Sequence, residues 1–321
     1  MVSRAFDLIF ISSVGWPLLL LPGAIQGRET VVDFWQIYFL TLPHRWITLI
    51  LVATDSDRRR DLGPVLPALA VGLAVIVIGV RLGTGALTCL AFVDYVWNAW
   101  HFAAQHQGIL RIYGRKAGLG PLPLERIGLR SFITYVILRT ATWSTGWLDE
   151  PLRLAGIVPW IDRCAALIPL YLVLSAMRRL GSASGAFLAY LSSVVGLYLC
   201  LLWSLATNWA SGVIALTTAS GFMHASEYLA VVSHYAIRRR KIGSEGPIRR
   251  LASSWFPLLG IYAITLGAFG SWAELEASGL RSLWMGVNLW AAFVHYAFDG
   301  LIWKLRRPET ARALAAIRSP T

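Results

Sequence analysis

Long apolar segments follow one another along almost the whole chain, and they restrict its fold more than any other feature of the sequence. A helix that spans a bilayer needs about 20 mostly apolar residues. Ten segments meet or nearly meet this requirement, at residues 7–25, 31–52, 62–80, 84–110, 131–148, 160–177, 185–206, 209–237, 252–270 and 281–303. We therefore predict an all-α, polytopic integral membrane helix bundle of about ten transmembrane helices, with eight to ten as the range. Arg139 and several threonines interrupt segment 131–148, which fits either a full span or a re-entrant or interfacial piece.

The composition excludes the usual soluble classes of protein. Hydrophobic residues make up 56% of the chain and charged residues 14%, and the mean hydropathy is +0.59. The net charge of +12 would suit a nucleic-acid-binding protein. However, the basic residues lie in short clusters between apolar segments, where they set the orientation in the bilayer. We expect no nucleic acid partner, and we expect a single transmembrane domain over residues 1–321.

Lysine and arginine alternate between the two sides of the predicted bundle. With ten spans and a cytoplasmic N-terminus, 22 of the 29 basic residues fall in cytoplasmic segments, and two, Arg45 and Arg139, fall inside spans. The outer loops hold Arg28, Arg81, Arg153, Arg163 and Arg281. Because cytoplasmic loops of membrane proteins are rich in basic residues, both termini are predicted in the cytoplasm, with the chain a multi-pass protein of a bacterial inner membrane.

The first apolar segment follows a basic start, as a signal peptide would. It holds Asp7, Trp16 and Pro17, and it lacks a clean small-residue cleavage site. We interpret it as a retained first helix.

All six histidines fall inside predicted spans and none falls in a loop. They are His44, His101, His106, His224, His234 and His295. Their segments all run from outside to inside in the ten-span arrangement, so each histidine lies ~6 to 21 Å from the cytoplasmic end of its helix at 1.5 Å per residue. Ionisable residues inside a membrane are costly and usually mark a functional site. The histidines therefore predict a site in the inner half of the bilayer.

Three of the histidine segments also carry acidic or amide residues on the histidine face of the helix. These groups are His224, Glu227 and His234; Asp94, Asn98, His101 and Gln105; and His295 with Asp299. Polar faces on three helices indicate one shared polar centre. Its candidate catalytic residues are Glu227, Asp299 and Asp94, acting as a carboxylate ligand, a base or an orienting partner of the ring nitrogens.

Two histidines need a local distortion to join this centre. His106 lies about 140° around an ideal helix from His101. Either a π-bulge within WHFAAQH brings the two together, or His106 faces the headgroups. His44 follows Pro43, which lacks a backbone N–H and is predicted to kink the helix and open a cavity.

Imidazole ligands from several helices, supplemented by carboxylates, suit iron, copper or zinc, whereas Mg²⁺ and Ca²⁺ prefer oxygen ligands. We predict a mono- or dinuclear non-haem iron centre. The proposed ligands are His101, His224, His234 and His295, with His44 and His106 as further candidates. Such a centre suits a metal-dependent oxidoreductase or oxygenase that oxidises, desaturates or oxygenates a lipid or polyene, with membrane lipids around it and a redox partner supplying electrons.

Two other hypotheses are compatible with the same residues. His44, His101, His224 and His295 could serve as axial ligands of haem b in an electron-transfer protein. The histidines and carboxylates could instead relay protons in a transporter or lipid-binding scaffold. The partners proposed for Arg45 and Arg139 are Asp33, Asp94 or an anionic substrate.

Three stretches carry a resemblance to known proteins: NAWHFAAQHQGILRIYGRKAG, HASEYLAVVSHYAIRRRK and VHYAFDGLIWKLRRPE. They resemble segments of bacterial His-rich polytopic membrane proteins, a group to which we relate the UnbU-type proteins encoded with enediyne polyketide synthases. That resemblance implies a role in maturing a long apolar polyene. The use of histidines from several helices is also similar to the Brp/Blh carotene dioxygenases, and LPHRWITL resembles a histidine motif of that family. The HxxHH boxes of membrane fatty-acid desaturases are absent from the sequence, which argues against a standard desaturase.

Overall fold

A computed structural model describes residues 3–20, 34–145, 156–179, 185–242, 247–276, 279–304 and 308–314. Every regular element within these ranges is helical, so the all-α prediction is confirmed for them. Asp33 and five of the 29 basic residues counted above lie outside the described ranges; the five are Arg28, Arg153, Arg306, Arg307 and Arg318.

The chain forms two compact units. Unit 1 comprises Met1–Asp33, Ala99–Glu227 and Ala316–Arg318, and unit 2 comprises Phe34–Asn98, Tyr228–Ala315 and Ser319–Thr321. Two long helices contribute residues to both units: α6 (Thr88–Lys116) and α10 (Ala210–Ile242). The single transmembrane domain expected from the sequence stays a prediction.

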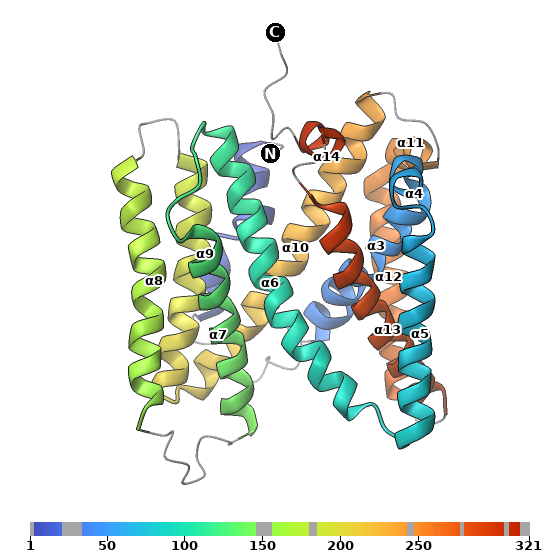
Figure 1. Cartoon of the computed structure of the whole chain (residues 1–321), viewed down its shortest axis with the longest axis horizontal. Helices are drawn as coiled ribbons and strands as arrows, with labels where there is room; N and C mark the ends of the chain where they lie inside the picture. Colours follow the sequence, from blue (N-terminus) through green and yellow to red (C-terminus); the bar gives the residue numbers. More distant parts are fainter. Residues whose placement is uncertain are drawn as a thin grey trace. The chain divides into compact units, whose positions relative to one another are not determined.

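Unit 1 is built around three helices that pack side by side: α7 (Glu125–Thr145), α8 (Val158–Arg179) and α9 (Gly185–Ala206) (Figure 1). Helix α9 forms much of its core, because Tyr190, Leu191, Leu197 and Tyr198 are all fully buried. The two tyrosines place hydroxyl groups inside this apolar core, and each needs a hydrogen-bond partner there.

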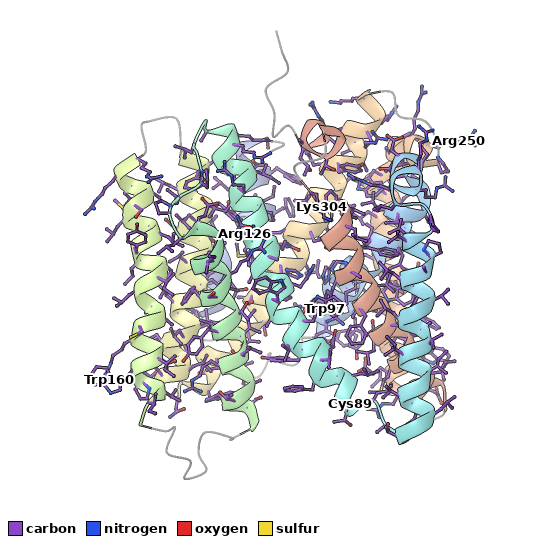
Figure 2. All side chains as sticks on the ribbon, in the orientation of Figure 1. Cys89, Trp97, Arg126, Trp160, Arg250 and Lys304 are labelled. Carbon is purple, nitrogen blue, oxygen red and sulfur yellow. The ribbon has the colours of Figure 1, made fainter. Side chains whose placement is uncertain are left out.

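Unit 2 is organised around α13 (Gly279–Ile302), which packs against α3 (Leu42–Thr54), α5 (Val65–Thr84) and α12 (Trp255–Leu275) (Figure 1). One core cluster of this unit joins Val77 of α5, Leu90 of α6 and Phe293 of α13. Trp97, labelled in Figure 2, packs on this cluster with its ring centroid 5.8 Å from that of Phe293.

Short helices lie near the ends of the long ones in unit 2. They are α4 (Ser56–Leu62), α11 (Pro247–Leu251), the 3-10 turn η5 (Ala252–Ser254) and α14 (Pro308–Ala313). None of these was predicted from the sequence, because they are too short to produce an apolar period.

Five described helices are long and apolar enough to cross a membrane, by length and composition. They are Phe34–Thr54, Val65–Thr84, Val158–Arg179, Gly185–Ala206 and Pro247–Leu275. Some of them expose large apolar side chains, such as Val75 on α5 and Leu167 on α8, which are both 64% accessible. Such surfaces fit lipid better than water, so the structure supports membrane association. The count of about ten spans is not supported, since α6, α7, α10 and α13 carry too many polar residues to meet this criterion.

The predicted first helix, 7–25, is wrong in the part that the structure describes. A π-helical turn, η1 (Asp7–Ile11), and a 3-10 turn, η2 (Trp16–Leu20), replace it. Ser13 between them has a φ of 43°, and Pro17 has no N–H to continue the helix. The Ser193 hydroxyl of α9 donates to the buried carbonyl of Ser12 at 2.5 Å, which gives this interrupted backbone a hydrogen-bond partner. Residues 21–25 lie outside the described ranges.

The distortion predicted at Pro43 is a π-helical turn, η3 (Ile37–Thr41), immediately before α3. A wider turn accommodates a proline whose ring would otherwise meet the carbonyl four residues earlier. The carbonyl of Pro43 accepts a hydrogen bond from the Tyr262 hydroxyl of α12 at 2.8 Å.

Candidate metal centre

Four of the six histidines form two ring pairs, one within each unit. In unit 2, the ring centroids of His44 and His295 are 4.9 Å apart, with planes at 86°. In unit 1, the ring centroids of His101 and His224 are 5.0 Å apart, with planes at 81°. All four residues are at most 7% exposed. Each pair thus places two polar rings together where water has little access.

The backbone at the start of α3 orients His44. Its Nδ1 lies 2.5 Å from the carbonyl oxygen of Thr41, the last residue of the π-helical turn. A carbonyl can only accept, so Nδ1 carries the hydrogen, and Nε2 of the neutral ring carries the lone pair. Metal-binding histidines are commonly oriented in this way by a backbone carbonyl.

A chain of side-chain hydrogen bonds orients His295. Its Nδ1 is 2.7 Å from the Thr48 hydroxyl, which is 2.5 Å from the Tyr228 hydroxyl. The Tyr228 hydroxyl in turn donates to Asp299 Oδ1 at 2.6 Å. Because Tyr228 gives its hydrogen to Asp299, Thr48 gives its own hydrogen to Tyr228. Thr48 therefore accepts from Nδ1 of His295, and Nε2 of His295 carries the lone pair.

The second oxygen of Asp299 lies 3.7 Å from His295 Nε2, on the adjacent turn of α13. A cation bound at Nε2 of His295 would attract this carboxyl oxygen as well as the ring lone pair. Trp303 Nε1 donates to Oδ1 of Asp299 at 3.1 Å and helps to hold the carboxylate in place.

Ring stacking and a side-chain amide position His224. The ring of Phe102 stacks on that of His224, with centroids 3.7 Å apart and planes 13° from parallel. Gln105 Nε2 donates to the backbone carbonyl of His224 at 2.8 Å and to Glu227 Oε2 at 3.1 Å. Phe102 and Gln105 both belong to α6, so the helix that carries His101 also determines the position of His224.

Glu227 and His106 form a separate buried network in unit 1. His106 Nδ1 lies 3.2 Å from Glu227 Oε1 and 3.1 Å from Oε2. The Tyr190 hydroxyl donates to Glu227 Oε1 at 2.9 Å, and His106 Nε2 lies 3.2 Å from the Tyr198 hydroxyl. Neither alternative predicted for His106 holds. Helix α6 is regular through residues 101–106, without a π-bulge, and His106 is fully buried and does not face the headgroups.

Each of His44, His101, His224 and His295 offers one ring nitrogen, and these four atoms lie within 4.8 Å of one another. This buried four-histidine group could hold a metal ion, since ring nitrogens are good ligands for first-row transition metals. Among the described residues, His106 and His234 are not part of the group. His234, on α10, is buried, with 8% of its surface exposed.

Asp94 belongs to a polar contact within unit 2. The Tyr296 hydroxyl lies 3.0 Å from Asp94 Oδ1 and 3.0 Å from Asn98 Oδ1, and Arg45 interacts electrostatically with Asp94. Arg139 has a different partner, because its Nε lies 3.8 Å from Asp162 Oδ1. Asp162 was not considered from the sequence, and Asp33 lies outside the described residues.

The hydroxyl groups that support the histidines were missed from the sequence. Thr48, Tyr228, Tyr190 and Tyr198 lie in apolar segments, where threonine and tyrosine are ordinary residues. The signal that could have found two of them is helical spacing, since Thr48 is four residues after His44 and Tyr228 is four residues after His224.

Comparison with known proteins identifies no relative of this chain. No protein-family model matches it, no curated protein matches it, and no solved structure matches it.

Proposed function

We propose that this chain is an integral membrane protein that binds one transition-metal ion through His44, His101, His224 and His295. The observation that supports this best is the approach of four buried ring nitrogens to within 4.8 Å of one another. In a tetrahedral site with metal–nitrogen bonds of about 2.0–2.1 Å, the nitrogens are about 3.4 Å apart. The four nitrogens would therefore move toward one another by about 1 Å when they bind an ion.

The charge balance near the proposed ligands favours a divalent ion. The four imidazoles are neutral ligands, so the ion would bring a double positive charge into a region with little water. Asp299 beside His295, and Glu227 linked through Gln105 to the backbone of His224, supply two carboxylates. They would offset this charge and orient the ligand rings.

We further propose non-haem iron as the metal and an oxidation, desaturation or oxygenation as the reaction. A redox-active ion is needed to attack the C–H bonds or double bonds of an apolar chain, which acids and bases leave unchanged. The apolar outer faces of α5, α8 and α12 support the proposed substrate class. A lipid or polyene would reach the centre from within the bilayer.

The four-histidine arrangement fits a haem less well. Axial ligands of a haem lie on opposite faces of a flat macrocycle that already supplies four nitrogens to the iron. With four imidazole nitrogens within 4.8 Å of one another, at least two would occupy the volume of the macrocycle. A small, bare ion is the ligand that this group can surround.

Metal analysis and an optical spectrum of the detergent-purified protein test the proposal. We expect about one equivalent of iron and no Soret band. Single variants His44→Ala, His101→Ala, His224→Ala and His295→Ala should each lower the bound metal severalfold. His234→Ala is the matched control, because it removes a buried histidine of α10 that lies outside the group.

The results separate the alternatives. A Soret band would identify a haem protein, and absence of any metal after reconstitution would leave a transporter or lipid-binding scaffold. Full metal retention in both His224→Ala and His295→Ala would exclude the four-histidine site. The protein could bind iron but consume no O₂ when polyene or lipid substrates are added. That result would support the metal site and contradict the proposed reaction.

A further inference from the structure

A pocket of about 1000 Å³ opens in unit 2, at the ends of two apolar helices. Its lining includes Thr54, Arg240, Arg249, Arg250, Leu251 and Ser253. Thr54 is the last residue of the candidate span Phe34–Thr54. Pro247 is the first residue of a second candidate span, Pro247–Leu275. The pocket therefore lies where two helices would leave the hydrocarbon region and enter the headgroups.

The three arginines are the groups in this pocket that remain able to bind a ligand. The Thr54 hydroxyl already donates to the carbonyl of Ile50 at 2.7 Å, and the Ser253 hydroxyl donates to the carbonyl of Arg250 at 2.6 Å. The side chains of Arg240, Arg249 and Arg250 are exposed. Figure 2 labels Arg250, which lies on α11.

The neighbouring Arg239 is neutralised by acidic residues of the same unit. Arg239 Nη2 donates to Asp55 Oδ1 at 3.3 Å and also to Asp57. In the part of the chain that the structure describes, no carboxylate forms an ion pair with the three pocket arginines. Three like charges around one pocket repel one another, and an anion that binds there removes the repulsion.

The helices that end at the pocket carry exposed apolar side chains. On α12, Phe256, Leu258 and Ile261 are 57%, 40% and 63% exposed, and Ile50 of α3 is 37% exposed. A soluble anion would make no use of these side chains. An amphiphile with a phosphate and acyl chains would use both the arginines and the apolar face.

We propose that this pocket binds the phosphate of an anionic phospholipid, with its acyl chains lying against α12. Arginine suits this role, because its planar guanidinium forms two parallel hydrogen bonds to phosphate oxygens. The site is independent of the proposed metal centre, and it would hold the ends of α3, α10 and α12 against a specific lipid.

Native mass spectrometry of the full-length protein in detergent provides the test. The protein is titrated with dioctanoyl phosphatidylglycerol, and in parallel with dioctanoyl phosphatidylcholine and with sn-glycerol 3-phosphate. We expect one phosphatidylglycerol to bind tightly and the other two to bind weakly. Each arginine removed should weaken phosphatidylglycerol binding about fivefold. Arg250→Gln should show one such step, and the triple variant Arg240→Gln, Arg249→Gln, Arg250→Gln should reduce binding about 100-fold.

A second triple variant controls for net charge. Arg126→Gln, Arg178→Gln and Arg179→Gln remove the same charge from exposed positions of unit 1, and this variant should bind phosphatidylglycerol like the unsubstituted protein. An equal loss of affinity in both triple variants would overturn the site, as would unchanged affinity in the pocket variant. Glycerol phosphate binding as tightly as the lipid would assign the pocket to a soluble phosphate and overturn the lipid proposal.

Discussion

The two histidines of unit 2 both engage Nδ1 in a hydrogen bond, but with different kinds of partner. His44 donates to a backbone carbonyl, which no side-chain substitution removes. His295 depends on the hydroxyl of Thr48. Thr48→Val keeps the shape of the side chain and removes that hydroxyl, so the ring of His295 loses the partner that determines its tautomer. We expect about 10- to 100-fold weaker metal binding, measured by titration of the metal-free protein in detergent.

Thr48→Ser is the matched control for this prediction, because serine restores the hydroxyl. Its metal affinity should lie close to that of the unsubstituted protein. Equal affinities for the valine and serine variants would show that the Thr48 hydroxyl does not orient a ligand.

The buried Glu227 uses both of its carboxylate oxygens as hydrogen-bond acceptors. Both of its oxygens accept hydrogen bonds, from Tyr190 and His106 at Oε1 and from Gln105 at Oε2. In Glu227→Gln, an NH₂ group in place of Oε2 would face the Gln105 donor, and an NH₂ group in place of Oε1 would require Tyr190 and His106 to exchange donor and acceptor roles. Rotation of Gln105 would not solve the conflict, since its Nε2 also donates to the carbonyl of His224.

We therefore expect Glu227→Gln to cost about 1–3 kcal/mol of unfolding free energy, visible as a lower midpoint of thermal unfolding in detergent. Glu276→Gln, at the end of α12, is the control and should leave the midpoint unchanged. A midpoint for Glu227→Gln equal to that of the control would contradict the network.

The sequence was informative about which polar residues are buried but not about how they combine. Histidine and aspartate are expensive in a membrane, so their presence in apolar segments is a strong signal. The proposal of a shared centre named all four histidines of the group, yet it also included His106 and His234. Helical spacing set His106 apart from His101, and His106 is indeed outside the group. Spacing could not separate His234 from His224, because it describes one helix at a time. Which side chain of a neighbouring helix faces a histidine depends on the packing, as Tyr190 and Tyr198 show for His106.

At the scale of elements, two glycines let α12 lie close to its neighbours in unit 2. A Cβ atom at Gly267 would lie 2.7 Å from Cδ1 of Phe39 and 2.8 Å from the backbone oxygen of Tyr38. Gly270 similarly contacts Leu42 and Trp284. Small residues of this kind allow close approach where van der Waals packing holds membrane helices together.

Gly267→Ala should therefore destabilise the protein by about 1–3 kcal/mol, because the backbone oxygen of Tyr38 cannot move away as a side chain would. Gly260→Ala on the same helix is the control, since a Cβ there meets nothing within 4 Å. That substitution should be neutral or raise stability by up to about 1 kcal/mol. Thermal unfolding of both variants in the same detergent measures the difference, and equal midpoints would remove the close-packing argument.

Helix positions followed from the sequence wherever an apolar segment was uninterrupted. The predicted segment 185–206 coincides with α9, whereas α6 continues to Lys116 and α7 begins at Glu125, beyond the apolar ends of their segments. Polar residues can extend a helix after it has left the apolar region, and hydropathy does not detect this. The failure at residues 7–25 has the opposite cause. That segment is apolar enough, but the conformation of Ser13 and the proline at 17 divide it.

At the scale of the whole molecule, mean hydropathy underestimates the number of spanning helices, because it also counts polar residues that face the protein interior. On α6, Asp94 and Asn98 contact Tyr296, whereas the exposed large side chains include Phe92, Val93, Val96 and Trp100. A lipid in contact with these exposed residues would meet an apolar surface. We infer that α6 spans the membrane although it is not among the five helices that length and composition select.

This inference predicts opposite locations for the two ends of α6. Arg111, Arg115 and Lys116 near its C-terminal end should remain in the cytoplasm, because basic residues close to a span resist transfer across the membrane. Alkaline phosphatase fused after Gly118 should then be inactive, and a fusion after Gly85, just before α6, should be active. Fluorescent protein fusions at the same sites should give the reverse pattern and control for expression. Two inactive phosphatase fusions would place both ends of α6 in the cytoplasm, and the reverse pattern of activities would invert the orientation predicted for the whole chain.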